Sequence, residues 1–291
     1  MNRVYSGLMK KFIYTVTIIF ATIANGQSTD VLIWKSDTLN LYSNPLELKA
    51  DWEQLNQVIT SQIGLNRVEK SKDSVILSYL WRNYKTEWFI ENDSLYLTDL
   101  SSLYSSEKSI GLNKVFSTTE KRIFADWVNS SLTTFRGTCI VCRGTHHKNT
   151  SIYPNEKLLE FKNGVLIKTT DYKNSVLRES KFSSSDPNVY LSFIYRNVEW
   201  SKLPDLSNKH LLVWVSVEPR KNGKLRNIDW KNTFLIDGSN LIDDPKNTYI
   251  KEAVRIAKKI PEWNVVIRHD KILNQDLKIV FDEHMKKKYG R

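Results

Sequence analysis

Short alternating runs of apolar and polar residues dominate the chain from residue 27 to about residue 180. Asn, Asp, Gly and Ser, which favour turns, repeatedly separate these runs. Alternation with a period of two is typical of strands that bury one face. The pattern therefore predicts a β-rich domain over residues 27–182.

Two β-hairpins are predicted within this domain. The first has strands over residues 87–90 and 95–100. The second has strands over residues 158–162 and 165–170, joined by Asn163-Gly164. Asn-Gly is a strong two-residue turn signal because both residues tolerate positive φ.

One helix is predicted between these strands and the start of the domain. Apolar residues recur there at helical spacing, and Gly64 would end the helix. The apolar positions are Leu48, Trp52, Leu55, Val58, Ile59 and Ile63.

The C-terminal part of the chain is predicted to form a small α+β domain over residues 190–291, after a polar linker at residues 183–189. The pattern predicts the order β-β-α-β. The elements are strands over 211–217 and 225–230, a loop over 237–247, a helix that Asn247 or Thr248 caps and Pro261 ends, and a strand over 277–282. Such a sheet is covered by its helix on one face and has a strand edge that is open to pairing.

The first 26 residues have the features of an export signal. Three basic residues precede an uncharged apolar run, Phe12–Ala24, which is shorter than the about 20 residues that a spanning helix needs. Small residues at Ala24 and Gly26 fit cleavage before Gln27. We therefore expect a signal peptide over residues 1–26, a periplasmic or secreted protein and no lasting membrane span. A permanent anchor is the alternative, if Asn25, Gly26 and Gln27 join the apolar run.

The chain is basic, with 43 Lys and Arg against 32 Asp and Glu and a net charge of +11. Cleavage before Gln27 would remove three positive charges. The densest basic run, at residues 286–288, reads as a solvated tail. We expect no nucleic-acid partner for an exported protein, whereas the same field would attract anionic lipid or peptidoglycan.

Cys139 and Cys142 are the only two cysteines of the chain. Zinc binding together with His146 is one reading, but structural zinc sites separate their two ligand pairs by about a dozen residues. No amphipathic helix follows Cys142, as a thioredoxin-like site would require. We favour a local disulfide over free thiols or a metal, and we expect neither a metal nor a cofactor.

No catalytic constellation is evident in the remaining residues. His210, His269 and His284 are scattered, and no nucleophile-elbow or phosphate-loop pattern occurs. We therefore expect a protein that is not an enzyme, with a periplasmic enzyme of unfamiliar site as the less favoured reading.

Three runs in the C-terminal domain carry a resemblance to a known family. These are VWVSVEPRKNGKLRNIDW, YIKEAVRIAKKIPEW and LKIVF. In order and spacing, residues 190–285 resemble the C-terminal domain of TonB-type proteins, including the Pro261 and Trp263 pair after the helix. The chain departs from that family at residues 264–267, where a Pro-Gly turn is usual, and it has no Pro-rich spacer. Energy transduction is therefore not expected.

The N-terminal domain carries a second resemblance, through WRNYKTEWFIENDSLYLTDL, FADW and LLEFKNGVLI. These runs are similar to an uncharacterised group of exported proteins of Gram-negative bacteria. The resemblance implies an envelope location and a β-rich fold, and it implies no site residues.

The function expected from these features is non-catalytic protein–protein interaction in the cell envelope. An extended segment of an envelope protein would pair with the last strand, at Leu277, Ile279, Val280 and Phe281. The alternative is binding of a glycan or peptidoglycan that stacks on Trp81 and Trp88. Aromatic residues on alternating strands more often belong to the core. The sequence does not predict the oligomeric state.

Overall fold

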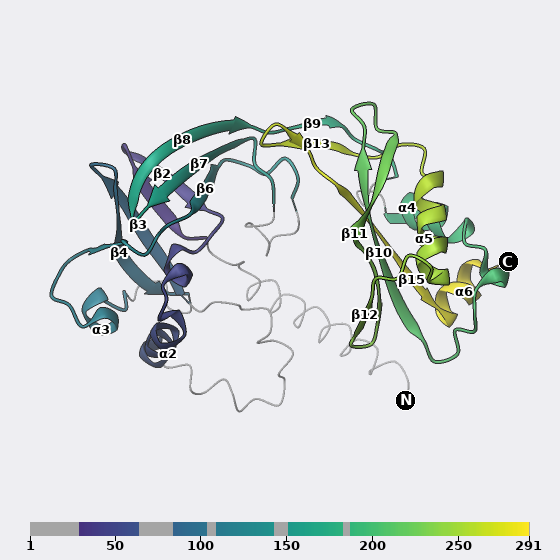
Figure 1. Cartoon of the computed structure of the whole chain (residues 1–291), viewed down its shortest axis with the longest axis horizontal. Helices are drawn as coiled ribbons and strands as arrows, with labels where there is room; N and C mark the ends of the chain where they lie inside the picture. Colours follow the sequence, from purple (N-terminus) through teal and green to yellow (C-terminus); the bar gives the residue numbers. More distant parts are fainter. Residues whose placement is uncertain (1–28, 64–83, 104–108, 143–150, 183–186, 291) are drawn as a thin grey trace, which may run out of the picture. The chain divides into compact units, whose positions relative to one another are not determined.

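A computed structural model describes residues 29–63, 84–103, 109–142, 151–182 and 187–290 (Figure 1). The chain forms two compact units, Met1–Lys173 and Asn174–Arg291. The predicted signal peptide, residues 1–26, lies outside the described residues. Within the described residues, no helix combines the length and the apolar character that crossing a membrane requires.

The first unit is built around a closed barrel of seven strands. Their order is β3-β1-β2-β6-β7-β8-β4, and pairing between β3 and β4 closes the ring. Neighbouring strands are antiparallel except β1 and β3, which are parallel. The strands are β1 (Val31–Trp34), β2 (Asp37–Leu41), β3 (Tyr84–Glu91), β4 (Ser94–Ser102), β6 (Ser131–Arg136), β7 (Asn155–Lys162) and β8 (Val165–Lys173), with β5 (Ile123–Phe124) added beside β4.

Alternation along the strands fills the barrel with apolar side chains. Leu32, Trp88, Leu97 and Leu159 are fully buried, whereas Lys85, next to Tyr84 in β3, is exposed. Burial of each large apolar side chain contributes about 1.5–3 kcal/mol. The predicted β-rich character of this part of the chain is confirmed.

Both predicted hairpins are confirmed. Asn163 and Gly164 have φ of 48° and 74°, and they join β7 to β8. Asn92 and Asp93 have φ of 48° and 60° and form a two-residue turn between β3 and β4, shorter than the sequence pattern indicated. Positive φ at both central residues matches the right-handed twist of the flanking strands.

The predicted helix of this unit is present but interrupted. A 3-10 helix, η1 (Pro45–Leu48), precedes α2 (Trp52–Ile63), which buries Leu55 and Ile59 against the barrel core. A further short helix, α3 (Leu112–Phe116), was not predicted.

The second unit has a four-stranded antiparallel sheet in the order β12-β11-β10-β15. The helix α5 (Thr248–Lys259) covers one face, and Asn247 caps it by accepting the N–H groups of Tyr249 and Ile250. The three predicted strands and the helix are present, although β11 continues to Asp237, past its predicted end at residue 230, and β12 occupies part of the predicted loop over 237–247. The strands are β10 (His210–Pro219), β11 (Leu225–Asp237), β12 (Asn240–Ile242) and β15 (Gln275–Asp282).

A small second sheet sets the border between the two units. The strand β13 (Val265–Arg268) pairs with β9 (Ser175–Arg178) and with β14 (Lys271–Ile272). Because β9 belongs to the second unit, that unit begins at Asn174, before the predicted linker at 183–189. The sheet also makes the predicted order β-β-α-β incomplete, since β13 and β14 lie between α5 and β15.

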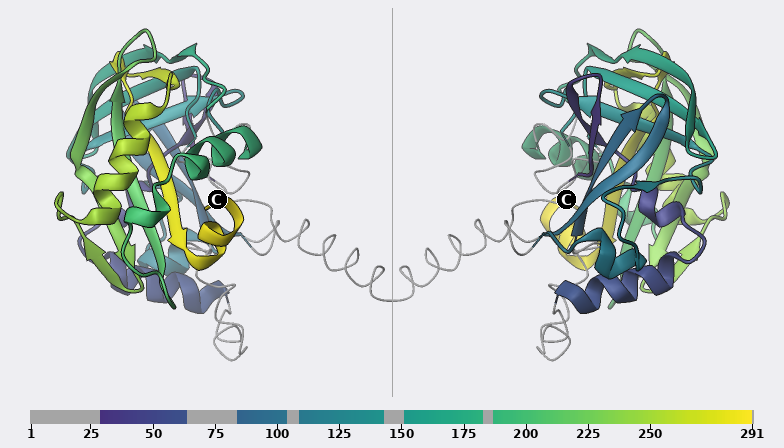
Figure 2. Two further views of the ribbon diagram at one scale, coloured as in Figure 1. Left: turned by 90° about the vertical axis from the view of Figure 1, so that its right-hand side faces the viewer. Right: turned by 90° about the vertical axis from the view of Figure 1, so that its left-hand side faces the viewer.

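Two further helices of the second unit pack against its core. The helix α4 (Pro187–Arg196) lies beside β15, on the other side of that strand from α5 (Figure 2, left). The helix α6 (Glu283–Tyr289) contains the basic run 286–288, which the sequence indicated as a tail. Asp282 caps α6 by accepting the N–H of Met285 at 2.7 Å. Along the chain, the 3-10 helix η5 (Trp200–Lys202) follows α4 and precedes β10.

Candidate functional site

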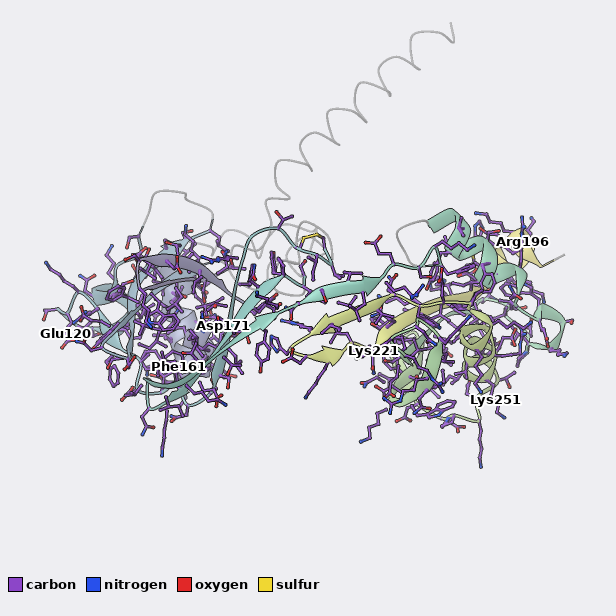
Figure 3. The ribbon with its side chains drawn as sticks, turned by 90° about the horizontal axis from the view of Figure 1, so that it is seen from above. Glu120, Phe161, Asp171, Arg196, Lys221 and Lys251 are labelled. Carbon is purple, nitrogen blue, oxygen red and sulfur yellow. A yellow bond between two sulfur atoms is a disulfide. The ribbon has the colours of Figure 1, made fainter. Side chains whose placement is uncertain are left out.

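Cys139 and Cys142 are joined by a disulfide, with their Cα atoms 5.4 Å apart (Figure 3). The sulfur atoms of the two residues are therefore bonded to each other and do not act as thiolate ligands. His146 and His147 lie outside the described residues. Across the described part of the chain, no three His, Cys, Asp or Glu residues are grouped closely enough to hold a metal ion.

Trp88, a predicted glycan-stacking residue, lies in the barrel core and has no exposed surface. Its indole N–H donates to the hydroxyl of Thr86 at 2.7 Å, and its ring meets the ring of Trp127 edge-on. A sugar cannot reach this face of the indole. The stacking site predicted there is therefore wrong at Trp88, and Trp81 lies outside the described residues.

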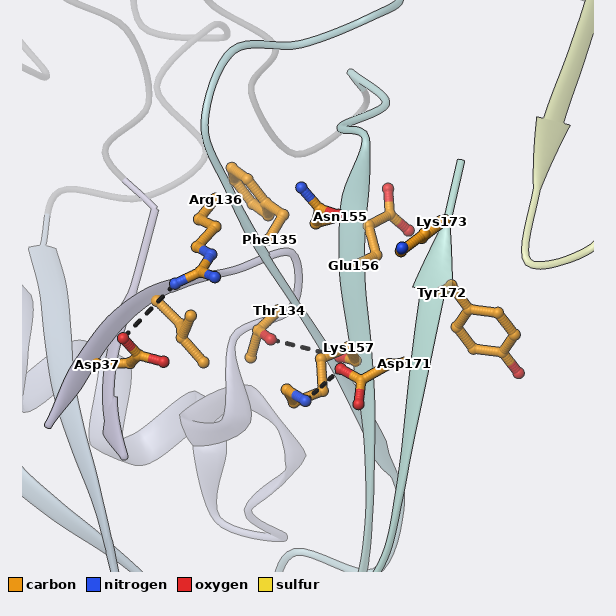
Figure 4. A pocket seen from close by; sticks show the side chains of 11 residues that line it. Asp37, Thr134, Phe135, Arg136, Asn155, Glu156, Lys157, Asp171, Tyr172 and Lys173 are labelled. Atoms are coloured by element: carbon orange, nitrogen blue, oxygen red, sulfur yellow. Dashed lines mark hydrogen bonds and ion pairs between the residues drawn. The ribbon is translucent and has the colours of Figure 1, made fainter. Parts of the chain in front are cut away.

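A cavity of about 280 Å³ lies at one end of the barrel, and we call it the barrel mouth (Figure 4). Four strands contribute to it, and Leu39 and Phe135 are the buried apolar residues of its wall. The lining residues are Asp37 and Leu39 of β2, Thr134, Phe135 and Arg136 of β6, Asn155, Glu156 and Lys157 of β7, and Asp171, Tyr172 and Lys173 of β8.

Strand register arranges the polar residues of the barrel mouth in two rows. Arg136 is paired with Asn155, which is paired with Lys173 on the next strand. One row deeper, Lys157 lies between Thr134 and Asp171, and it forms an ion pair with Asp171. Directly paired residues point to the same side of a sheet, so each row presents its side chains together.

Charges of both signs meet at the barrel mouth. Arg136 and Asp37 form an exposed ion pair with 3.5 Å between nitrogen and oxygen. The ammonium group of Lys157 also lies 5.6 Å from the centre of the Trp34 ring. These charged and amide side chains can form hydrogen bonds and ion pairs with a polar ligand.

The sequence pattern indicated the second hairpin but not this cavity. In the structure, Lys157 and Asn155 continue the inward face of Leu159, opposite Asp171 and Lys173, beyond a bulge between Glu160 and Phe161 that the turn does not specify. Polar residues at inward positions near the end of a predicted hairpin were the feature of the sequence that could have indicated this cavity. Arg136 could not be added, because its pairing with β7 depends on the tertiary structure.

The strand β15 lies at the edge of its sheet, as the predicted interaction requires. Leu277, Ile279 and Phe281 are fully buried beneath the helices. In an antiparallel pair, backbone groups point alternately toward and away from the neighbouring strand. The N–H of Val280 points away from β10, so Lys278 and Val280 present their backbone groups at the outer edge.

This outer edge is occupied at both residues, contrary to the open edge that the sequence predicts. The N–H of Val280 donates to the phenol oxygen of Tyr195 at 3.1 Å. The phenol of Tyr190 forms a hydrogen bond with the backbone of Lys278. Both tyrosines belong to α4, and we call the pair the tyrosine cover. Burial raises the pKa of Tyr190 to about 12 and also raises the pKa of Tyr195.

The opposite side of the sheet has features that disfavour pairing with another strand. Only residues 235–237 of β11 pair with β12. Elsewhere β11 has a large register shift, where Asp229 and Thr233 are bridged by a hydrogen bond from the Thr233 hydroxyl at 2.8 Å. Lys231, within the shift, is exposed. Bulges and lysines at an edge prevent the addition of a further strand.

Comparisons of the chain with protein-family models, with curated proteins and with solved structures find no match. Among the described residues, the barrel mouth and the edge of β15 are therefore the two candidate functional sites.

Proposed function

We propose that the protein is an exported, non-catalytic envelope protein that binds another envelope protein by adding an extended segment of the partner to β15. The observation that carries this proposal is the way in which the backbone groups at the outer edge of β15 are hydrogen-bonded. Its outward N–H groups at Lys278 and Val280 are held by side chains and not by another strand. Main-chain hydrogen bonds would supply the affinity, and neighbouring side chains would select the partner.

The geometry of β15 favours this edge over β11. Eight consecutive residue pairs join β15 to β10 without a register shift, from His210 opposite Asp282 to Val217 opposite Gln275. A regular strand presents evenly spaced backbone groups, and an added strand needs such groups. The register shift in β11 interrupts that spacing.

An envelope location is part of the same proposal. The disulfide between Cys139 and Cys142 supports an oxidising compartment, because thiols are kept reduced in the cytosol. Cleavage before Gln27 would deliver the chain there. Mass spectrometry of the protein purified from cell fractions tests this, and a periplasmic or secreted product that begins at Gln27 is expected. Recovery of chains that still begin at Met1 would contradict it.

Site-specific photocrosslinking in cells tests the interaction. With p-benzoylphenylalanine at Asp276, next to the proposed partner strand, a covalent adduct with an envelope protein is expected. Val280→Pro removes the outward N–H and preserves the bonds to β10, so this second change should abolish the adduct. Lys278→Pro offers an independent test of the same edge.

Leu241→Pro is the matched control for the proline changes. Asp237 and Asn240 close the two-residue hairpin between β11 and β12, so the N–H of Leu241 also points away from its sheet. This variant should form the adduct at the original yield. A secreted, folded Val280→Pro protein that still gives the full adduct would refute strand addition at β15.

A second candidate function is supported by the barrel mouth, namely binding of a small polar ligand such as a peptidoglycan fragment. Arg136, Asn155 and Lys173 form one row of donors at the edge of a 280 Å³ cavity. Mouths of barrels are common ligand sites. Saturation-transfer NMR with soluble disaccharide-peptide fragments should give signals that Asn155→Ala removes and Asn227→Ala, in exposed β11, preserves. No signal with the wild-type protein would refute this candidate.

A further inference from the structure

The tyrosine cover satisfies the edge of β15 through two phenol groups on one helix. Tyr195 accepts the N–H of Val280 at 3.1 Å, and Tyr190 bonds to the backbone of Lys278, two residues earlier on the strand. Alternate residues on one edge are those that an added strand would use. The helix α4 therefore occupies the backbone groups on which the proposed function depends.

A side-chain cover is a weaker occupant of this edge than a strand. A phenol oxygen can satisfy the N–H of one residue, whereas a paired strand bonds both the N–H and the C=O of each outward residue. Replacing the cover with a partner strand therefore increases the number of main-chain hydrogen bonds. Burying a phenol oxygen costs free energy unless that oxygen is hydrogen-bonded. When a partner strand takes the backbone groups of Lys278 and Val280, the phenols of Tyr190 and Tyr195 lose their hydrogen bonds, and release of α4 returns them to water.

The helix α4 is anchored firmly at its C-terminal end. The guanidinium of Arg255 donates to the carbonyl of Asn197, immediately after α4, and Glu252 accepts the N–H of Glu199 at 2.6 Å. The ring of Tyr195 also stacks with that of Tyr289, with 5.1 Å between their centres. We place the hinge for this displacement at residues 197–199. Leaving the edge then also breaks the stack of Tyr195 on Tyr289 and removes Ile194 and Tyr195 from the core.

Charge on the outward face of β15 indicates the chemistry of the partner segment at one position, Lys278, which lies between Asp276 and Asp282 on that face. The second unit, from Asn174 to Arg291, contains 22 Lys and Arg against 15 Asp and Glu. Lys278 is exposed, and its ammonium group lies 4.0 Å from the centre of the Trp214 ring. A residue directly opposite Lys278 on an added strand would lie close to this charge, and opposite charges in such pairs stabilise a sheet.

On the basis of the proposed function, we infer that α4 occupies the partner site in the free protein. An extended partner segment with an acidic residue opposite Lys278 displaces the tyrosine cover from β15. The site is thus closed in the free protein and opened by exchange of phenol contacts for main-chain hydrogen bonds.

Amide hydrogen exchange on the full mature chain tests the cover without any partner. Tyr195→Phe removes the acceptor of the Val280 N–H, so exchange at Val280 should become at least about fivefold faster, the factor expected for one hydrogen bond. Exchange at Ile279, which bonds to β10, should not change. Tyr190→Phe should act in the same way on Lys278 and serves if the first variant does not fold. Unchanged exchange at both positions would overturn the inference.

The photocrosslinking assay then tests displacement. Tyr195→Phe should raise the adduct yield at low partner concentration, consistent with about fivefold tighter binding, because one competing bond is lost. Tyr249→Phe is the matched control, since its hydroxyl donates to the carbonyl of Pro204 away from the edge. A synthetic extended peptide with a glutamate opposite Lys278 should bind more tightly than the same peptide with a lysine at that position.

The outcomes separate the two proposals. If Val280→Pro abolishes the adduct while Tyr195→Phe leaves both exchange and yield unchanged, strand addition stands and the cover is refuted. If Val280→Pro leaves the adduct intact, strand addition is refuted, and faster exchange in Tyr195→Phe would show only an intramolecular contact, so the displacement inference is refuted as well.

Discussion

Arg255 forms a two-pronged ion pair with Glu252, with its Nε and Nη2 atoms each 2.7 Å from a carboxylate oxygen. The carboxylate is nearly buried, and the hydrogen bond with Glu252 raises the pKa of Arg255. The same two side chains bind the backbone of Asn197 and Glu199. This pair therefore connects α5 to the hinge after α4.

Arg255→Met should destabilise the second unit by about 2–3 kcal/mol, because it leaves a buried carboxylate without its charged partner. Urea unfolding followed by circular dichroism measures the loss. Lys258→Met, at an exposed position of the same helix, is the control and should change stability by less than about 0.5 kcal/mol. Equal effects of the two changes would show that the ion pair contributes nothing.

Alkaline pH should weaken the contact of Tyr190 with β15. Burial raises its pKa to about 12 from an ordinary value of 10.0, so the folded protein holds this proton more tightly than the unfolded chain. The contribution to stability is complete below pH 10 and is lost as the pH rises from 10 to 12. Absorbance at 295 nm should show a late-titrating component that includes Tyr195, whose pKa burial also raises, and Tyr190→Phe should reduce this component by one tyrosine. Retention of the whole late component in that variant would contradict the assignment.

Trp88→Ala should destabilise the barrel by about 3–5 kcal/mol, because it creates a large cavity and removes the donor to Thr86. Trp230→Ala makes the same chemical change at a side chain that is 42% exposed and should cost far less. Thermal unfolding monitored by circular dichroism compares the two. A small effect at Trp88 would place its ring outside the core.

Gly164→Ala should destabilise the hairpin of β7 and β8 more than positive φ alone explains. An added Cβ would lie 2.6 Å from the backbone oxygen of Ala125. Gly238 also has positive φ but has no heavy atom within 4 Å of the added Cβ, so Gly238→Ala isolates the conformational cost of about 1 kcal/mol. We expect Gly164→Ala to exceed that cost by at least about 1 kcal/mol in urea unfolding. Equal costs would exclude the clash.

Elements that depend on neighbouring residues could be predicted from the sequence. Asn163-Gly164 specifies its turn because both residues adopt positive φ readily. The start and end of α5 follow from the capping side chain of Asn247 and from Pro261. In these cases the determining interaction lies within a few residues of the element itself.

Contacts between distant residues could not be predicted. Pairing of β1 with β3 joins Leu32 to Trp88, and pairing of β9 with β13 moves the border of the second unit to Asn174. The sequence could not show whether the indole of Trp88 is exposed or buried, because the alternation of apolar and polar residues does not specify which face of a strand is covered.

The sequence by itself determined the hairpins, the strands β10, β11 and β15 of the C-terminal sheet, the helix α5 and the pair of cysteines, since local turn chemistry, capping and periodicity specify them. Only the tertiary structure decided which edges and faces remain accessible. Closure of the barrel buries Trp88 and forms the barrel mouth, and docking of α4 places Tyr195 on the N–H of Val280. Accessibility depends on which distant segments pack together, and that choice is made by the free energy of the whole fold.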